Sequence, residues 1–156
     1  MAPLLTLRIY TGTSAGTESA AQSGIALMDI DSATNAPVAN DIAKGANSFE
    51  KWMRIKVDDA DGLSFTNFWI ERSGDVPDGV TVKMGVTDTA STPTAATSSI
   101  ATTTMADGRR YIFDANEYDA DNDTTRYLVI QAQVAASAAT GNIEQQVFTV
   151  GYSQST

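Results

Sequence analysis

The 156-residue chain contains no cysteine and no histidine. The absence of cysteine excludes disulfides, zinc–thiolate sites and cysteine nucleophiles. The absence of histidine excludes the Ser-His-Asp triad, the imidazole general base and the commonest zinc and copper ligands. No glycine-rich phosphate-binding motif is present among the remaining residues. We therefore expect a protein that is not an enzyme, has no catalytic residues and uses no cofactor.

Long apolar runs are also missing from the chain. No run approaches the ~20 residues that a transmembrane helix needs, and residues 1–10 lack the basic and apolar regions of a signal peptide. Acidic side chains dominate, with 19 Asp and Glu against 10 Lys and Arg, so the formal net charge is −9. A chain of this charge is repelled by phosphate backbones and anionic lipids. We expect neither a nucleic acid nor a membrane as its partner.

Short alternating runs separated by clusters of Gly, Ser, Thr, Asn, Asp and Pro are typical of β-strands joined by turns. The clearest run is residues 80–87, where apolar and polar or small side chains alternate. The predicted strands are residues 4–10, 25–30, 49–57, 64–71, 80–87, 100–105, 110–113, 126–134 and 145–152. The best helix candidate, residues 14–21, is short and weakly amphipathic.

Short strands at roughly ten-residue spacing predict a single all-β domain over residues 1–156. Its fold is expected to be an antiparallel two-sheet β-sandwich, Ig-like or jelly-roll. Residues 11–24 and 31–47 are predicted to be long loops or arms that order along a neighbouring subunit. The period-2 pattern of the strands predicts a core, made up of Leu5, Leu7, Ile9, Met53, Ile55, Val80, Val82, Met84, Leu128, Ile130 and Val150.

An acidic segment precedes the strand at residues 126–134. The run Asp-Ala-Asp-Asn-Asp at residues 119–123 imitates the start of an EF-hand loop, but Thr124 and Ile130 occupy the positions that require Gly and Glu. A calcium site of another type stays open, with its ligands drawn from Asp114, Glu117, Asp119, Asp121 and Asp123. A solvated acidic turn is the favoured interpretation, as it is for the acidic turn at residues 58–61. No metal ligand is assigned.

The two tryptophans are candidate recognition residues. Trp52 is predicted to lie on the polar face of its strand, and Trp69 is predicted to share a face with Phe65, Asn67 and Glu71. An exposed tryptophan would allow a pyranose ring to stack on it. Packing at the rim of the sandwich or in a subunit interface is the favoured interpretation, because aromatic side chains are common there.

Several phrases rich in small polar residues are spread over the chain. They are residues 7–21 (LRIYTGTSAGTESAA), 45–52 (GANSFEKW), 77–89 (PDGVTVKMGVTDT), 92–95 (TPTA) and 131–142 (QAQVAASAATGN). These phrases resemble those of small virion proteins that are encoded beside capsid genes in tailed bacteriophages. The resemblance extends from near the start of the chain to near its end.

The resemblance implies a structural role, that of a capsid decoration (cement) protein. Such a protein is made in the host cytoplasm and lies on the capsid exterior of the virion. It binds the major capsid protein and sister copies of itself, as a homo-oligomer, and so stabilises the shell. One alternative is a tail, neck or head-fibre β-module that binds another virion protein or a host glycan. A second alternative is a carbohydrate-binding module.

The net charge of −9 leads to a prediction about nucleic acid. We expect no retention of the protein on a DNA column at about 0.15 M salt, where the screening length is about 8 Å, because the chain has no basic stripe to neutralise phosphates. Elution with the column void is the expected result. Retention that falls as salt is raised would contradict it.

Overall fold

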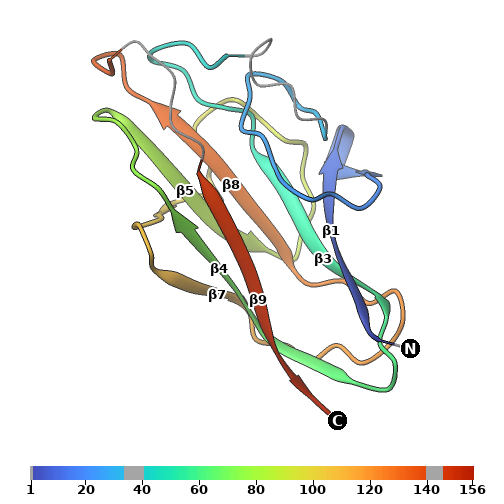
Figure 1. Cartoon of the computed structure of the whole chain (residues 1–156). Helices are drawn as coiled ribbons and strands as arrows, with labels where there is room; N and C mark the ends of the chain where they lie inside the picture. Colours follow the sequence, from blue (N-terminus) through green and yellow to red (C-terminus); the bar gives the residue numbers. More distant parts are fainter. Residues whose placement is uncertain (1, 34–40, 140–145) are drawn as a thin grey trace.

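The computed structural model describes residues 2–33, 41–139 and 146–156, which fold into two antiparallel sheets (Figure 1). The first sheet has six strands in the order β2-β1-β3-β8-β5-β6, and the second has three in the order β7-β4-β9. The strands of the first sheet are β1 (Leu4–Thr11), β2 (Thr17–Glu18), β3 (Lys51–Asp59), β5 (Val80–Thr87), β6 (Thr103–Thr104) and β8 (Tyr127–Val134). Those of the second are β4 (Ser64–Ser73), β7 (Arg110–Asp114) and β9 (Val147–Ser155). The predicted all-β sandwich is confirmed.

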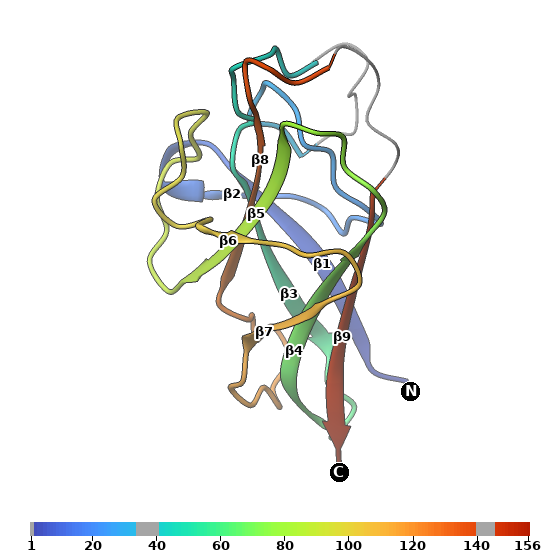
Figure 2. The ribbon, with the colours of Figure 1, turned by 90° about the vertical axis from the view of Figure 1, so that its left-hand side faces the viewer.

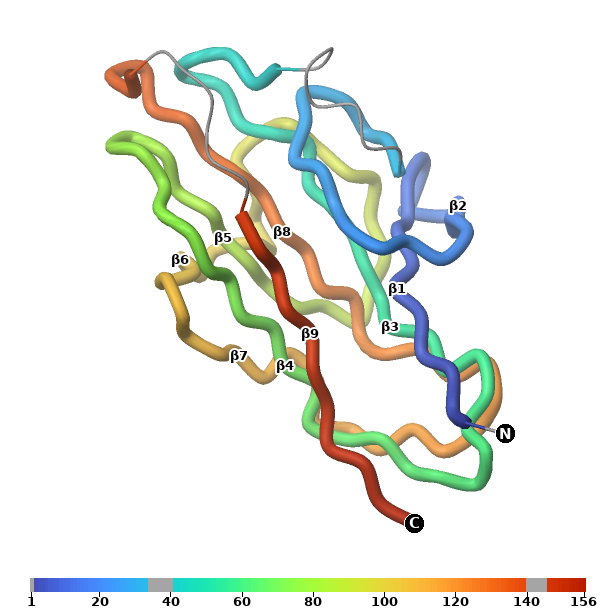
Figure 3. Tube along the Cα trace, in the orientation of Figure 1, coloured from blue at the N-terminus to red at the C-terminus, as the bar shows by residue number. Residues whose placement is uncertain are grey.

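The chain crosses repeatedly between the two sheets. From β3 onward, the strands of five or more residues, which we call the long strands, alternate between the six-stranded and the three-stranded sheet (Figure 3). They are β3, β4, β5, β7, β8 and β9. In an immunoglobulin constant-type domain the fifth strand lies between the second and the fourth. Here β8, the second-to-last long strand, lies between β3 and β5. The strand order therefore differs from that of the constant-type domain.

The hydrophobic core lies between the sheets, as the alternation of the strands predicts. The predicted core residues that are buried there are Ile9, Met53, Ile55, Val82, Met84, Leu128 and Ile130. Leu5, Leu7 and Val150 are partly buried against them, and Val80 is also buried. Much of the opposite half of the core comes from residues that the prediction left out, namely Phe65, Phe68, Ile70 and Phe113.

Three predicted elements are wrong or much reduced. Residues 25–30 form no strand, although Ile25 and Leu27 pack against the core, because burying an apolar side chain does not require a ladder partner. Of the predicted strand at residues 100–105, only Thr103–Thr104 pairs as β6. The helix candidate is reduced to a 3-10 turn at Thr13–Ala15. Among the described residues, no helix is long and apolar enough to cross a bilayer.

A β-bulge in β4 reverses the predicted orientation of its aromatic side chains. Asn67 has φ 51°, and the register of β4 with β9 shifts between Thr66 and Trp69. As a result Phe65 and Phe68 are both fully buried in the core. The prediction that Trp69 shares a face with Phe65 is therefore wrong, because the extra residue turns Trp69 to the outer face.

The predicted arm at residues 11–24 packs on its own chain. It contains β2, and the amides of Ser19 and Gln22 donate to the carbonyls of Ile9 and Leu7 at 2.8 and 2.9 Å. These bonds cover the outer edge of β1, so the expectation that this segment orders only on a neighbour is wrong. Of the other predicted arm, residues 31–47, positions 34–40 lie outside the described residues.

Part of the outer face of the six-stranded sheet, over β3, β8 and β5, is covered by the segment of residues 88–102, which we call the covering segment. Figure 2 shows it on the opposite side of this sheet from β4 and β9. Gly85 of β5 points toward it, and a Cβ atom there would lie 1.7 Å from the carbonyl oxygen of Ile100. The covering segment can therefore lie close to the sheet only because residue 85 has no side chain.

We predict that Gly85→Ala displaces the covering segment. Overpacking of this kind costs about 1–3 kcal/mol, or a fall of roughly 2–12 °C in Tm for a domain of this size. Tryptophan emission should also shift to longer wavelength, because Trp52 lies beneath the segment. Gly24→Ala is the matched control, since a Cβ atom there meets nothing within 4 Å. Equal Tm values for the two variants would contradict the prediction.

Candidate interaction surfaces

The side-chain amide of Gln131 holds the covering segment on the sheet. Gln131 is fully buried on the outer face of β8, and its Oε1 accepts a hydrogen bond from the amide of Ser98 at 3.0 Å. Its Nε2 donates to the carbonyls of Ser48 and Ala96 at 3.0 and 2.8 Å. A second tie joins the amide of Glu50 to the carbonyl of Thr94 at 2.9 Å. These bonds satisfy backbone groups that burial would otherwise leave unpaired.

A small aromatic cluster lies beneath the same segment. Trp52 has 0% exposure and donates from Nε1 to Glu50 at 2.9 Å. Its ring lies 5.3 Å from that of Tyr127, which also contacts Tyr10 edge-on and carries the guanidinium of Arg54 over its face at 4.3 Å. A sugar cannot stack on an indole that has no exposed surface. The sugar-binding interpretation is therefore wrong for Trp52, which packs inside the domain.

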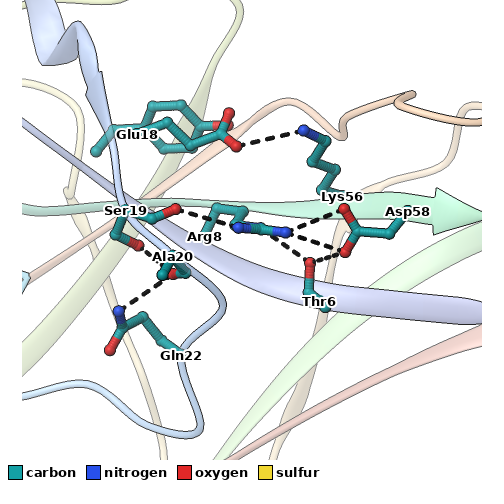
Figure 4. A network of polar contacts seen from close by, with 9 residues as sticks. Thr6, Arg8, Glu18, Ser19, Ala20, Gln22, Lys56 and Asp58 are labelled. Carbon is teal, nitrogen blue, oxygen red and sulfur yellow. Dashed lines mark hydrogen bonds and ion pairs between the residues drawn. The ribbon is translucent and has the colours of Figure 1, made fainter.

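A polar network joins β1, β2 and β3 beside this cluster (Figure 4). The guanidinium of Arg8 donates to both carboxylate oxygens of Asp58, at 3.0 and 3.2 Å, and Thr6 also donates to Asp58. Lys56 pairs with Glu18 at 3.4 Å. Burial raises the pKa of Asp58, but the hydrogen bonds from Thr6 and Arg8 outweigh it and hold that pKa below its usual value. The network ties β2 and β1 to β3.

The acidic segment before β8 is a hydrogen-bonded turn. Asp114 is buried and accepts from the hydroxyl of Tyr118 at 2.6 Å and from the amide of Arg126 at 2.7 Å. Asp121 accepts from the amide of Ala60, and Asp123 from the amide of Ala120. Three of the five candidate calcium ligands thus bond to the protein itself. The described part of the chain contains no group of three or more His, Cys, Asp or Glu placed to hold a metal ion.

The outer face of the three-stranded sheet exposes apolar side chains. Trp69 lies half-buried across Gly151 of β9, where a Cβ atom would come within 2.1 Å of the indole. The guanidinium of Arg110 lies 3.9 Å from the centroid of this ring and pairs with Glu71 at 3.2 Å. Ile112, opposite Trp69 on β7, is 63% exposed. We call this patch, together with the 53% exposed Val147, the Trp69 face.

A cavity of about 230 Å³ opens between the sheets on the side where β1 and β9 border them. It is lined mostly by apolar side chains of the core, among them Leu7, Ile25, Ile70, Phe113 and Val150. Its polar lining residues are Ser23, Arg54 and Gln146, and no carboxylate is among them. The cavity marks the side on which the sandwich is least closed.

Comparison of the chain with protein-family models, with curated proteins and with solved structures found no match. The function must therefore be argued from the surfaces. The alternation pattern placed Trp52 and Trp69 on strands. It gave no sign of the covering segment, which buries Trp52, or of the bulge at Asn67, which leaves Trp69 partly exposed.

The bond between Tyr118 and Asp114 leads to a prediction about pH. Burial, together with this hydrogen bond, raises the pKa of Tyr118 from 10.0 to about 12. The folded state thus favours the neutral phenol, so its stabilising contribution is complete below pH 10 and is lost as the pH rises to about 12. We expect the free energy of unfolding to fall less steeply over this pH range in Tyr118→Phe than in the native chain.

Chemical denaturation at stepwise pH measures this difference. The matched control is Tyr152→Phe, which makes the same change at an exposed tyrosine and leaves the bond between Tyr118 and Asp114 in place. The same slope in Tyr118→Phe and the native chain would show that Tyr118 titrates as in the unfolded chain.

Proposed function

We propose that this chain is a structural protein of a bacteriophage virion that decorates the capsid exterior. In this role it binds the major capsid protein and sister copies of itself and thereby stabilises the assembled shell. The proposal brings together the resemblance of its phrases to small virion proteins, the absence of cysteine and histidine, the net charge of −9 and the β-sandwich fold.

The observation that carries the proposal is the difference between the outer faces of the two sheets. The six-stranded sheet is covered by residues of its own chain, which bury Trp52 and Val129 completely. The three-stranded sheet leaves Ile112 63% exposed beside Trp69. Exposed apolar side chains grouped around an aromatic residue and rimmed by charges mark protein-binding sites. We therefore assign capsid binding to the Trp69 face.

The side chains of this face are suited to a protein partner. Trp69 and Arg110 are of residue types that are enriched among the residues that dominate binding energy. Glu71 pairs with Arg110, so the charge at the rim is partly neutralised before binding. A specific interface needs about 800 Å² from each partner, and a shell repeats that contact many times. Modest affinity at each contact is therefore enough to stabilise the whole particle.

One alternative is a tail, neck or head-fibre module that binds another virion protein or a host glycan, and a second is a carbohydrate-binding module. Glycan binding in either role would draw on Trp69, the one tryptophan with exposed surface. The guanidinium of Arg110 occupies one face of that ring at 3.9 Å, and a pyranose would have to displace it. This geometry favours a protein partner over a sugar.

The test compares phage particles with and without the protein. Particles that lack it should assemble but release their genome at a lower temperature, because each lost interface removes contact area that stabilises the shell. Genome release on heating, followed with a DNA-binding dye, measures this. Identical release curves, or location of the protein at the tail tip by cryo-electron microscopy, would defeat the decoration role and favour the alternative.

A substitution on the Trp69 face tests where the shell binds. We expect Ile112→Glu to weaken binding to shells that lack the protein by roughly tenfold or more, because it places a charge in an apolar contact. Ile30→Glu is the matched control, since Ile30 is also an exposed isoleucine (39%) but belongs to no strand of this sheet. Co-sedimentation with shells measures both variants. Equal binding of the two variants to shells would show that the capsid contact lies outside the Trp69 face.

A further inference from the structure

Strand β9 forms an open edge of the three-stranded sheet. In the described residues its hydrogen-bonded neighbour is β4 alone, along a register that runs from Ser64–Ser155 to Ser73–Val147. The other sheet edges are protected. Residues 17–22 cover β1, β6 pairs with β5, and β7 is only five residues long with a charged residue at each end. The long edge of β9 is the exception (Figure 3).

The sequence of β9 carries none of the features that keep edge strands apart. Natural edges are protected by charges, prolines or bulges that turn the strand away. Residues 147–155 (VFTVGYSQS) contain no charged residue and no proline, in a chain that has 29 charged residues, 19 acidic and 10 basic. Val147 and Tyr152 are also exposed apolar side chains on this strand, at 53% and 41%. Such an edge is a template for pairing with another strand.

We propose that β9 pairs antiparallel with β9 of a second copy of this chain. The absence of charge favours a second copy, because two molecules of net charge −9 repel each other least where neither carries charged side chains. An antiparallel strand pair is also self-complementary about a two-fold axis, which is the commonest symmetry of homo-oligomers. The outward side chains of Thr149 and Ser153, and Gly151 between them, are small enough for close approach.

The pairing joins the two three-stranded sheets into one sheet of six strands. The order becomes β7-β4-β9 followed by β9-β4-β7 of the second copy. The Trp69 faces of both copies then lie on one continuous sheet. This inference identifies the sister-copy contact within the proposed function, on which its biological role rests. The association itself is a property of the isolated protein and is measured without shells.

Single cysteines provide the test, because the native chain contains none. Opposite residues in an antiparallel ladder have Cα atoms about 4.5–5.5 Å apart, which is within the range that a disulfide spans. A residue on the two-fold axis faces its own copy, whereas a residue two positions away faces a different residue and lies roughly 13 Å from its own copy. Cysteine scanning along β9 should therefore give disulfide-linked dimers at one position and little cross-linking at its neighbours.

Position 151 is left out of the scan, because a Cβ atom there would collide with Trp69. If the axis lies at this position, a mixture of Thr149→Cys and Ser153→Cys forms the disulfide while neither variant does so alone. The native protein should be a dimer by light scattering at rising concentration. A monomer at every concentration, or cross-linking without a preferred position, would overturn the proposal.

Added charge gives a second, independent readout. Thr149→Asp/Ser153→Asp places four negative charges at the contact and should weaken the dimer by roughly tenfold or more. Ser99→Asp/Thr103→Asp adds the same charge at exposed positions outside the three-stranded sheet and is the matched control. If the two double variants leave the dimer equally stable, the dimer forms through another surface. If the protein dimerises through β9 but does not bind shells, the β9 contact is supported and only the capsid role is contradicted.

Discussion

The position of the covering segment on the six-stranded sheet depends on the buried amide of Gln131. Its single oxygen bonds to the amide of Ser98, and its nitrogen bonds to the carbonyls of Ser48 and Ala96. A neutral amide can do this because it accepts and donates at once. Without it, a segment of Ala, Ser and Thr would have little apolar surface with which to hold itself on a sheet. The polar contact therefore helps to bury the outer face of the six-stranded sheet beneath the covering segment.

The two sheets consequently differ in what they offer to other molecules. The six-stranded sheet has a core on each face, since Trp52, Val129 and Ala101 form a second cluster beneath the covering segment. The three-stranded sheet has a core on one face only. It also has the open edge, so its outer face and its border strand are both available on the same side of the molecule. A protein built to join a larger assembly can dedicate one sheet to stability and the other to contacts.

The alternation of apolar residues predicted the sandwich and most of one half of its core. It also predicted six of the long strands to within about two residues. These features could be predicted because period-2 burial is a local property of the sequence. It did not predict the surfaces. The covering segment has the composition of a solvated loop, and its burial depends on Gly85 and Gln131, which lie far from parts of it in sequence. One residue with φ 51°, Asn67, reversed the expected face of Trp69.

The register of the three-stranded sheet also sets how the chain must fold. In its central strand, residue 64 pairs with residue 155. In the other sheet, β3 and β5 are joined only through β8, which follows both of them in the sequence. Closing such long loops costs entropy before any contact offsets it, and sheets dominated by non-local pairs fold in milliseconds to seconds. Until β9 pairs with β4, β4 exposes a strand edge that carries Phe65, Phe68 and Ile70. Synthesis at high concentration therefore exposes the nascent sandwich to aggregation through β4, a hazard that the finished fold removes.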